Sequence, residues 1–145
     1  MIRQVAESSL KPDGTPITVA VVGLSGQTDR PSHRVARKLH RLGYRIVGVN
    51  PAYAGLQILG EPCVGHLAEV PYAVDVVQVF RGSEHAPAVA QEASHHPAPV
   101  FWLQEGVVSQ PAAETAHRAG KSVVMNRCLF KEIQRLRGTV ATYPR

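Results

Sequence analysis

A chain of 145 residues with a formal net charge of +5 has room for one domain of ordinary size, so we expect residues 1–145 to form a single domain whose core spans about residues 17–136. Hydrophobic residues make up 44% of the chain and charged residues 19%, a balance that excludes a disordered chain. The positive charge favours an anionic partner, but the basic residues are spread out and not clustered with aromatic ones, which argues against nucleic acid.

The amino-terminal segment and the cysteines argue against export, membrane insertion and metal binding. Residues 1–18 lack the apolar core of a secretory signal, and no apolar run approaches the roughly 20 residues that span a bilayer. Cys63 and Cys128 lie far apart, without zinc-ligand spacing around either. We therefore expect a cytoplasmic protein with no membrane partner and no metal site.

Apolar runs of strand length alternate with segments of helical period along most of the chain. Each run is continuously apolar, so both faces of each strand should be buried, as in a parallel sheet covered by helices on both sides. The pattern predicts an α/β fold of three layers, Rossmann-like, with a mainly parallel, doubly wound sheet. The predicted strands are Ile17–Val22, Arg45–Val49, Val74–Phe80, Val100–Leu103 and Ser122–Met125.

Prolines and glycines mark the ends of the predicted helices. A helix should precede a turn at residues 12–14, and another should begin at Pro31 and end at Gly43, because proline suits a first helical turn and glycine a last residue. The irregular segment 51–71 should hold a short strand near Cys63 and a helical turn over His66–Glu69. Further helices are predicted over Ser83–Ser94, Gln110–Ala119 and Leu129–Arg137.

Residues 19–35 form a strand, a Gly/Ser turn and the start of a helix, an arrangement that suits a phosphate. Backbone N–H groups at a helix start have no partner, and the helix dipole favours an anion there. Gly23 permits the tight turn, Ser25 and Ser32 add hydroxyl donors, and Arg30 adds a permanent charge. The dinucleotide fingerprint is incomplete, because Ser25 and Thr28 replace two of its glycines, so a turn without a ligand remains an alternative.

The residue at the end of the second predicted strand helps to distinguish which nucleotide is bound. An NAD-binding unit usually carries an acidic residue there for the ribose hydroxyls, whereas this chain has Asn50 followed by Pro51. The change argues against NAD and is compatible with a ribose that carries a phosphate. A plain turn is the alternative use of this dipeptide.

Six sequence blocks, taken together, closely resemble the stand-alone CoA-binding domain family, which is similar to the N-terminal domain of the succinyl-CoA synthetase α subunit. The blocks are Val22–Ser25, Asp29–Ser32, Gly48–Pro51, Asp75–Arg81, Trp102–Gly106 and Met125–Cys128. They occur in order across residues 17–136. Gly26 and His33 depart from the family pattern, in which proline and an aromatic residue are common at these two places.

The resemblance implies that coenzyme A lies across the strand ends, at the crevice where the strand order reverses. The implied contacts are Gly23, Ser25, Gly26, Gln27, Arg30 and Ser32 at the phosphates, Asn50 and Pro51 at the adenosine, Phe80 and Arg81 in the next loop, Gln104 and Gly106 near the pantetheine arm, and Asn126 and Arg127 after the last strand.

A non-catalytic or regulatory protein that binds coenzyme A or acyl-CoA is the function that we expect. The synthetase forms a phosphohistidine in a separate domain with no counterpart here, and the seven histidines are scattered without a nucleophile motif, so no catalytic residue is assigned. A small NAD(P)-dependent oxidoreductase, or an acyl-CoA enzyme subunit that needs a partner chain, is the alternative. Whether the chain forms a homo-oligomer stays open.

Overall fold

Five parallel strands form the main sheet of the computed structural model, which describes residues 2–141. They are β1 (Thr18–Val22), β2 (Arg45–Val49), β5 (Val76–Val79), β6 (Val100–Leu103) and β7 (Ser122–Met125). Their order across the sheet is β2-β1-β5-β6-β7, and every neighbouring pair is parallel. The order therefore reverses between β1 and β5, as in a doubly wound sheet, which confirms the predicted fold class.

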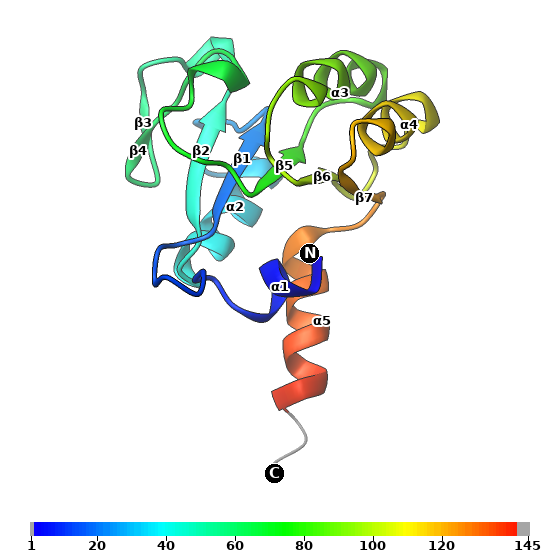
Figure 1. Cartoon of the computed structure of the whole chain (residues 1–145). Helices are drawn as coiled ribbons and strands as arrows, with labels where there is room; N and C mark the ends of the chain where they lie inside the picture. Colours follow the sequence, from blue (N-terminus) through cyan, green and yellow to red (C-terminus); the bar gives the residue numbers. More distant parts are fainter. Residues whose placement is uncertain (1, 142–145) are drawn as a thin grey trace.

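Helices cover both faces of this sheet (Figure 1). On one face lie α2 (Pro31–Arg41) and α5 (Leu129–Ala141), with α1 (Ile2–Glu7) packed against α5; on the other lie α3 (Ala86–Ser94) and α4 (Gln110–Arg118). Val19 and Val21 of β1 pack toward α2 and α5, while Ala20 and Val22 pack toward α3 and α4. Because successive side chains point to opposite faces, a strand buried on both is apolar at most of its positions; the buried Gln78 of β5 is an exception.

The predicted helix boundaries are confirmed within a few residues. Pro31 opens α2, and Gly43 follows it with a φ of +101°, which favours glycine. Ser109 caps α4 by accepting a hydrogen bond from the Ala112 N–H. The helix predicted over 83–94 is a 3-10 turn, η3 (Ser83–His85), followed by α3, and α5 runs on to Ala141.

A small hairpin beside β2 was only partly predicted. Its strands are β3 (Gln57–Ile58) and β4 (Glu61–Pro62), and it lies between the 3-10 turns η1 (Pro51–Tyr53) and η2 (Leu67–Glu69). The strand near Cys63 and the turn near His66 were expected, whereas β3 was not. Strands of two residues are too short to show a hydrophobic period, so the sequence pattern does not reveal them.

The two edges of the main sheet differ in how they are covered. Beside β2, the backbone of Val64 exchanges hydrogen bonds with Gly48 and Asn50. The four residues of β7 at the other edge are only partly buried, so the expectation that both faces of every strand are buried was wrong there. An edge strand has a neighbour on one side only, which leaves its side chains less enclosed.

Asp75 and Trp102 both have structural roles. Oδ2 of Asp75 accepts the Thr18 N–H at 2.9 Å and lies 3.3 Å from Nζ of Lys11, so this carboxylate caps a strand end beside a base. Trp102 is buried, and its indole N–H donates to the Arg127 carbonyl at 2.8 Å. Among residues 2–141, no helix combines the length and the apolar character that crossing a membrane requires.

The ends of β1 and β5 approach each other closely at the point where the strand order reverses. Gly23 follows β1 with a φ of +95°, and its N–H donates to the Val49 carbonyl at 2.9 Å. A Cβ atom at Gly23 would lie 2.7 Å from the carbonyl oxygen of Phe80. Glycine is therefore required here both by the backbone conformation and by the space available.

Replacing Gly23 with alanine should destabilise the fold strongly. The left-handed φ and the clash with the Phe80 backbone each cost free energy, and we expect a loss of about 3 kcal/mol in urea unfolding. Gly60→Ala is a matched control, because Gly60 has a φ of +89° but open space around it. Its loss should be about 1 kcal/mol. Equal losses at the two positions would show that the approach to Phe80 is not a constraint.

Two histidines should make the protein less stable in mild acid. Burial lowers the pKa of His33 below its ordinary value of 6.5, and Arg37 acts in the same direction; burial, with a smaller effect of Lys121, lowers the pKa of His96. The unfolded chain therefore binds more protons than the folded one once the pH falls below about 6.5. We expect the free energy of unfolding in urea to decrease as the pH is lowered from about 7.5 to about 5.5.

Single variants separate this effect from acid instability in general. His96→Asn should make the decrease shallower, whereas His117→Asn, at an exposed position of α4, should leave it unchanged. A free energy of unfolding that rises over the same pH interval would contradict the assignment.

Candidate functional site at the carboxyl ends of the strands

Two adjoining hollows lie at the carboxyl ends of β1, β2 and β5. The first has a volume of about 350 Å³ and is lined by Gly23, Ser25, Gln27, Arg30, Pro31, Ser32, Tyr53 and Phe80. The second has a volume of about 520 Å³ and is lined by Gly23, Asn50, Pro51, Ala52, Phe80, Arg81, Gly82, Glu84 and His85. Gly23 and Phe80 border both, so the hollows form one cleft at the reversal of strand order, where ligands bind in doubly wound sheets.

Hydrogen bonds within the protein hold the loop after β1 in shape. The Ser25 N–H donates to Oγ of Ser32 at 3.0 Å, and the Gln27 N–H donates to Oγ of Ser25 at 3.0 Å. Nε of Arg30 donates to Oε1 of Gln27 at 3.1 Å. Each serine hydroxyl thus accepts a bond from the backbone and keeps its own hydrogen, which can be donated to a ligand.

The amino terminus of α2 opens at this loop without a capping side chain. Its N-cap residue is Arg30, which makes no side-chain capping bond, and Pro31 follows. The N–H groups of Ser32 and His33 belong to the first turn and have no carbonyl four residues back within the helix. Together with the helix dipole and the exposed Arg30 guanidinium, they favour an anion.

His33 adds no charge to this helix terminus. Its ring is buried, and Nδ1 lies 3.4 Å from Nη1 of Arg37. Burial and the Arg37 guanidinium lower the pKa of His33, so the imidazole is neutral near pH 7. The positive character of the first turn therefore comes from Arg30 and the backbone.

Asn50 braces the cleft with both ends of its amide. Nδ2 donates to the Leu24 carbonyl at 3.0 Å, and Oδ1 accepts the Ala52 N–H at 3.0 Å. The first bond joins the end of β2 to the loop after β1, and the second caps η1. Asn50 stands where an NAD-binding unit would carry the carboxylate that binds ribose, and here the side-chain amide is bonded within the protein.

Several residues of the cleft were missed by sequence reasoning. Tyr53 lies in η1 and lines the first hollow, while Glu84 and His85 line the second, close to Arg81. Tyr53 follows Asn50 by three residues, so its position just after the second predicted strand could have indicated that it lines the cleft. Nothing in the sequence distinguishes His85 from an exposed surface histidine.

The remaining predicted site residues join the ends of β6 and β7 to α5, outside the walls of these two hollows. Gln104 is buried, and its Oε1 accepts bonds from Nε2 of Gln78 at 2.9 Å and from the Leu129 N–H at 3.2 Å. The Gly106 N–H donates to Oδ1 of Asn126 at 2.8 Å. The amide of Gln104 therefore supports the start of α5, and Asn126 holds the loop after β6.

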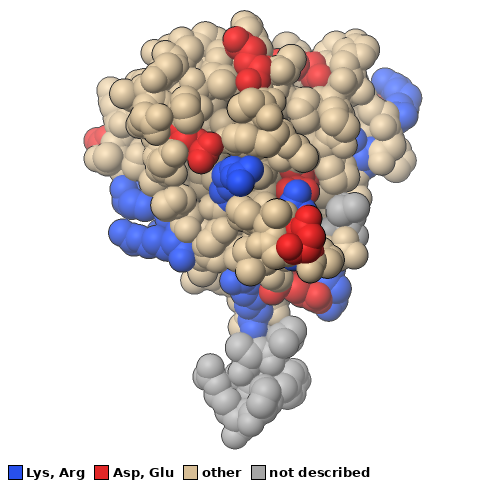
Figure 2. Space-filling view, turned by 60° about the vertical axis from the view of Figure 1, so that its left-hand side comes forward, with Lys and Arg blue, Asp and Glu red and all other residues tan. Residues whose placement is uncertain are grey.

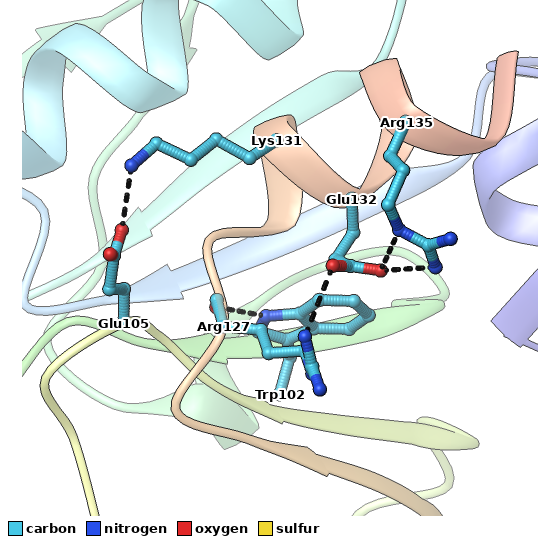
Figure 3. Close-up of polar contacts among 6 residues, drawn as sticks. All are labelled: Trp102, Glu105, Arg127, Lys131, Glu132 and Arg135. Carbon is cyan, nitrogen blue, oxygen red and sulfur yellow. Dashed lines mark hydrogen bonds and ion pairs between the residues drawn. The ribbon is translucent and has the colours of Figure 1, made fainter. Parts of the chain in front are cut away.

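Arg127 and the residues around it form ion pairs with one another (Figure 3). Nη1 of Arg127 lies 3.5 Å from Oε1 of Glu132, and Nζ of Lys131 lies 3.0 Å from Oε1 of Glu105. Hydrogen bonds from Arg135 are the main cause of the lowered pKa of Glu132, and Arg127 contributes less. Figure 3 shows the Arg127 guanidinium beside Glu132 of α5. The structure thus gathers the predicted residues into two groups, one around the cleft and one at the start of α5.

Comparison with known proteins identifies the family to which the chain belongs. A family model described as CoA binding domain matches residues 17–134. The uncharacterized protein YneT of Bacillus subtilis is 41% identical over 111 residues, which cover 77% of this chain and 81% of YneT. The family match spans all five strands of the main sheet and the residues that line the cleft.

Solved structures agree with this match. The structure of cell-free ID.343 from Thermus thermophilus has a TM-score of 0.80 and 34% identity, covering 83% of this chain and 90% of that one. The dinucleotide-forming acetyl-coenzyme A synthetase 1 of Ca. Korarchaeum cryptofilum has a TM-score of 0.64 and 20% identity, covering 76% of this chain and 26% of that one, and shares the fold alone. From the extent of the family match and the 41% identity to YneT, the chain belongs to the family of CoA-binding domains.

Proposed function

We propose that the chain binds coenzyme A or an acyl-CoA in the cleft between the ends of β1, β2 and β5, in a non-catalytic or regulatory role. The observation that carries the proposal is the uncapped amino terminus of α2 with Arg30 beside it, which opens on a hollow at the reversal of strand order. Backbone N–H groups, serine hydroxyls and a guanidinium are suitable partners for the diphosphate of the coenzyme.

The second hollow supports the proposed placement of the rest of the coenzyme. Asn50 and Pro51 border it on one side and Phe80 and Arg81 on the other. We place the adenosine and the arm that leaves the diphosphate in the space between them. Asn50 uses its amide within the protein, so it would contact the ligand mainly through surface complementarity. Contacts from Gln104, Gly106, Asn126 and Arg127 to the pantetheine arm stay a prediction.

The surface charge is compatible with binding a single small anion. Figure 2 shows Lys and Arg side chains in separate small groups, several of them beside Asp and Glu, without a continuous basic stripe among the described residues of that face. A duplex would contact many phosphates at once and needs such a stripe. A local site at the start of α2 fits the net charge of +5 better.

Removing the guanidinium of Arg30 should weaken the binding of coenzyme A. We expect Arg30→Ala to cost about 1 to 3 kcal/mol of binding free energy in isothermal titration calorimetry, because a charge-assisted hydrogen bond to phosphate is lost. Arg41→Ala is the matched control: it removes the same charge from the other end of α2. An equal loss for both variants would indicate attraction by net charge, and no loss for Arg30→Ala would contradict the assigned site.

Native mass spectrometry with coenzyme A, NAD and NADP tests the identity of the ligand. Coenzyme A should form a complex of one ligand per chain at lower concentration than either dinucleotide. A preference for NAD or NADP would overturn the proposal in favour of an oxidoreductase, and the absence of any complex would overturn nucleotide binding altogether.

A further inference from the structure

The side chain of Tyr53 closes one side of the first hollow. It is half-buried, and it lines the hollow together with Phe80, Arg30 and Ser25. Its Oη lies 3.5 Å from Oγ of Ser25, which is the outer limit of a hydrogen bond. Both hydroxyls therefore keep hydrogen-bonding capacity for a third group that approaches the two oxygens together.

The ring of Tyr53 is seated on the backbone of Gly26. A Cβ atom at Gly26 would lie 2.8 Å from Cε1 and 2.9 Å from Cδ1 of Tyr53, and 3.1 Å from Cδ2 of Leu56. Gly26 is not among the glycines with a positive φ, so its backbone conformation is open to other residues. What glycine supplies at this position is the space that the aromatic ring occupies.

The backbone around Tyr53 is tied to the sheet and to the hairpin. The Tyr53 N–H donates to the Asn50 carbonyl at 3.0 Å, and the Leu56 N–H donates to the Tyr53 carbonyl at 3.0 Å. Asn50 in turn binds the Leu24 carbonyl in the loop after β1. Tyr53 is thus held in place before any ligand arrives, which lowers the entropic cost of using its hydroxyl.

We propose that Tyr53 binds the diphosphate of the ligand, its hydroxyl and that of Ser25 donating to phosphate oxygens while its ring shields them from water. This inference rests on the proposed function and specifies its ligand class, nucleotides and coenzymes that carry a 5′-diphosphate. Arg30 supplies the cation of the same hollow, and the N–H groups of the first turn of α2 supply the remaining donors. Exclusion of water strengthens each of these bonds.

Tyr53→Phe tests the role of the hydroxyl and leaves the ring in place. The affinities for coenzyme A and for ADP, measured by calorimetry, should both fall about tenfold, because both ligands carry the diphosphate that the hydroxyl would bind. Tyr72→Phe is the matched control, because the Tyr72 hydroxyl donates to Glu61 outside the cleft; it should leave both affinities unchanged. Circular dichroism shows that each variant is folded.

The results separate this inference from the proposed function. If the wild-type protein does not bind coenzyme A, the proposed function fails. If the wild type binds but Tyr53→Phe binds equally well, the role of Tyr53 fails alone. A loss for coenzyme A without a loss for ADP would place Tyr53 on the pantetheine arm and would also overturn its role at the diphosphate.

Gly26→Ala provides a second and independent test. The added methyl group would displace the Tyr53 ring, so the affinity for coenzyme A should fall without any change in the hydroxyl itself. In the Gly26→Ala background, Tyr53→Phe should then have almost no further effect, because the hydroxyl is already out of place. If the affinity losses of the two single variants multiply in the double variant, the contribution of the Tyr53 hydroxyl does not depend on the contact between the ring and Gly26.

Discussion

The approach of two backbone segments at the reversal of strand order is the constraint on which the site depends. The loop after β1 passes so close to the Phe80 carbonyl that only glycine fits at position 23. This contact places the ends of β1 and β5 beside the same cleft. A hydrogen bond from the Gly23 N–H to the Val49 carbonyl holds the end of β2 next to them. Three strand ends are thus held together by backbone geometry before any side chain contributes.

Polar side chains of the cleft stabilise its own loops before they meet a ligand. Asn50 braces the loop after β1, Ser32 accepts the Ser25 N–H, and Gln27 holds the guanidinium of Arg30. Such bonds preorganise a loop that would otherwise pay conformational entropy on binding. In the proposed complex, recognition of the diphosphate would fall to the N–H groups of the first turn of α2, to the remaining hydroxyl hydrogens and to Arg30.

The start of α5 is held by a second polar system within the protein. Gln78 and Gln104 lie in the buried layer under α5, and Trp102 holds the backbone of Arg127 from below. Oε1 of Gln78 has no hydrogen-bond partner in the described structure, so this core carries one unpaired acceptor. A buried acceptor without a partner costs free energy, although Nε2 of the same side chain donates to Gln104.

The sequence by itself determined the strands of the main sheet, the approximate helix boundaries and the Gly/Ser loop after β1. These features depend on local signals: the mostly apolar runs of β1, β5 and β6, the proline at position 31 and the glycines at positions 23 and 43. Only the tertiary structure decided which of the polar residues at the strand ends face the cleft. The amide of Gln104 supports the start of α5, while its predicted contact with the ligand stays a prediction; Tyr53 was not expected but lines the first hollow. The direction of a side chain at a strand end depends on the segments packed against it, and these come from distant parts of the chain.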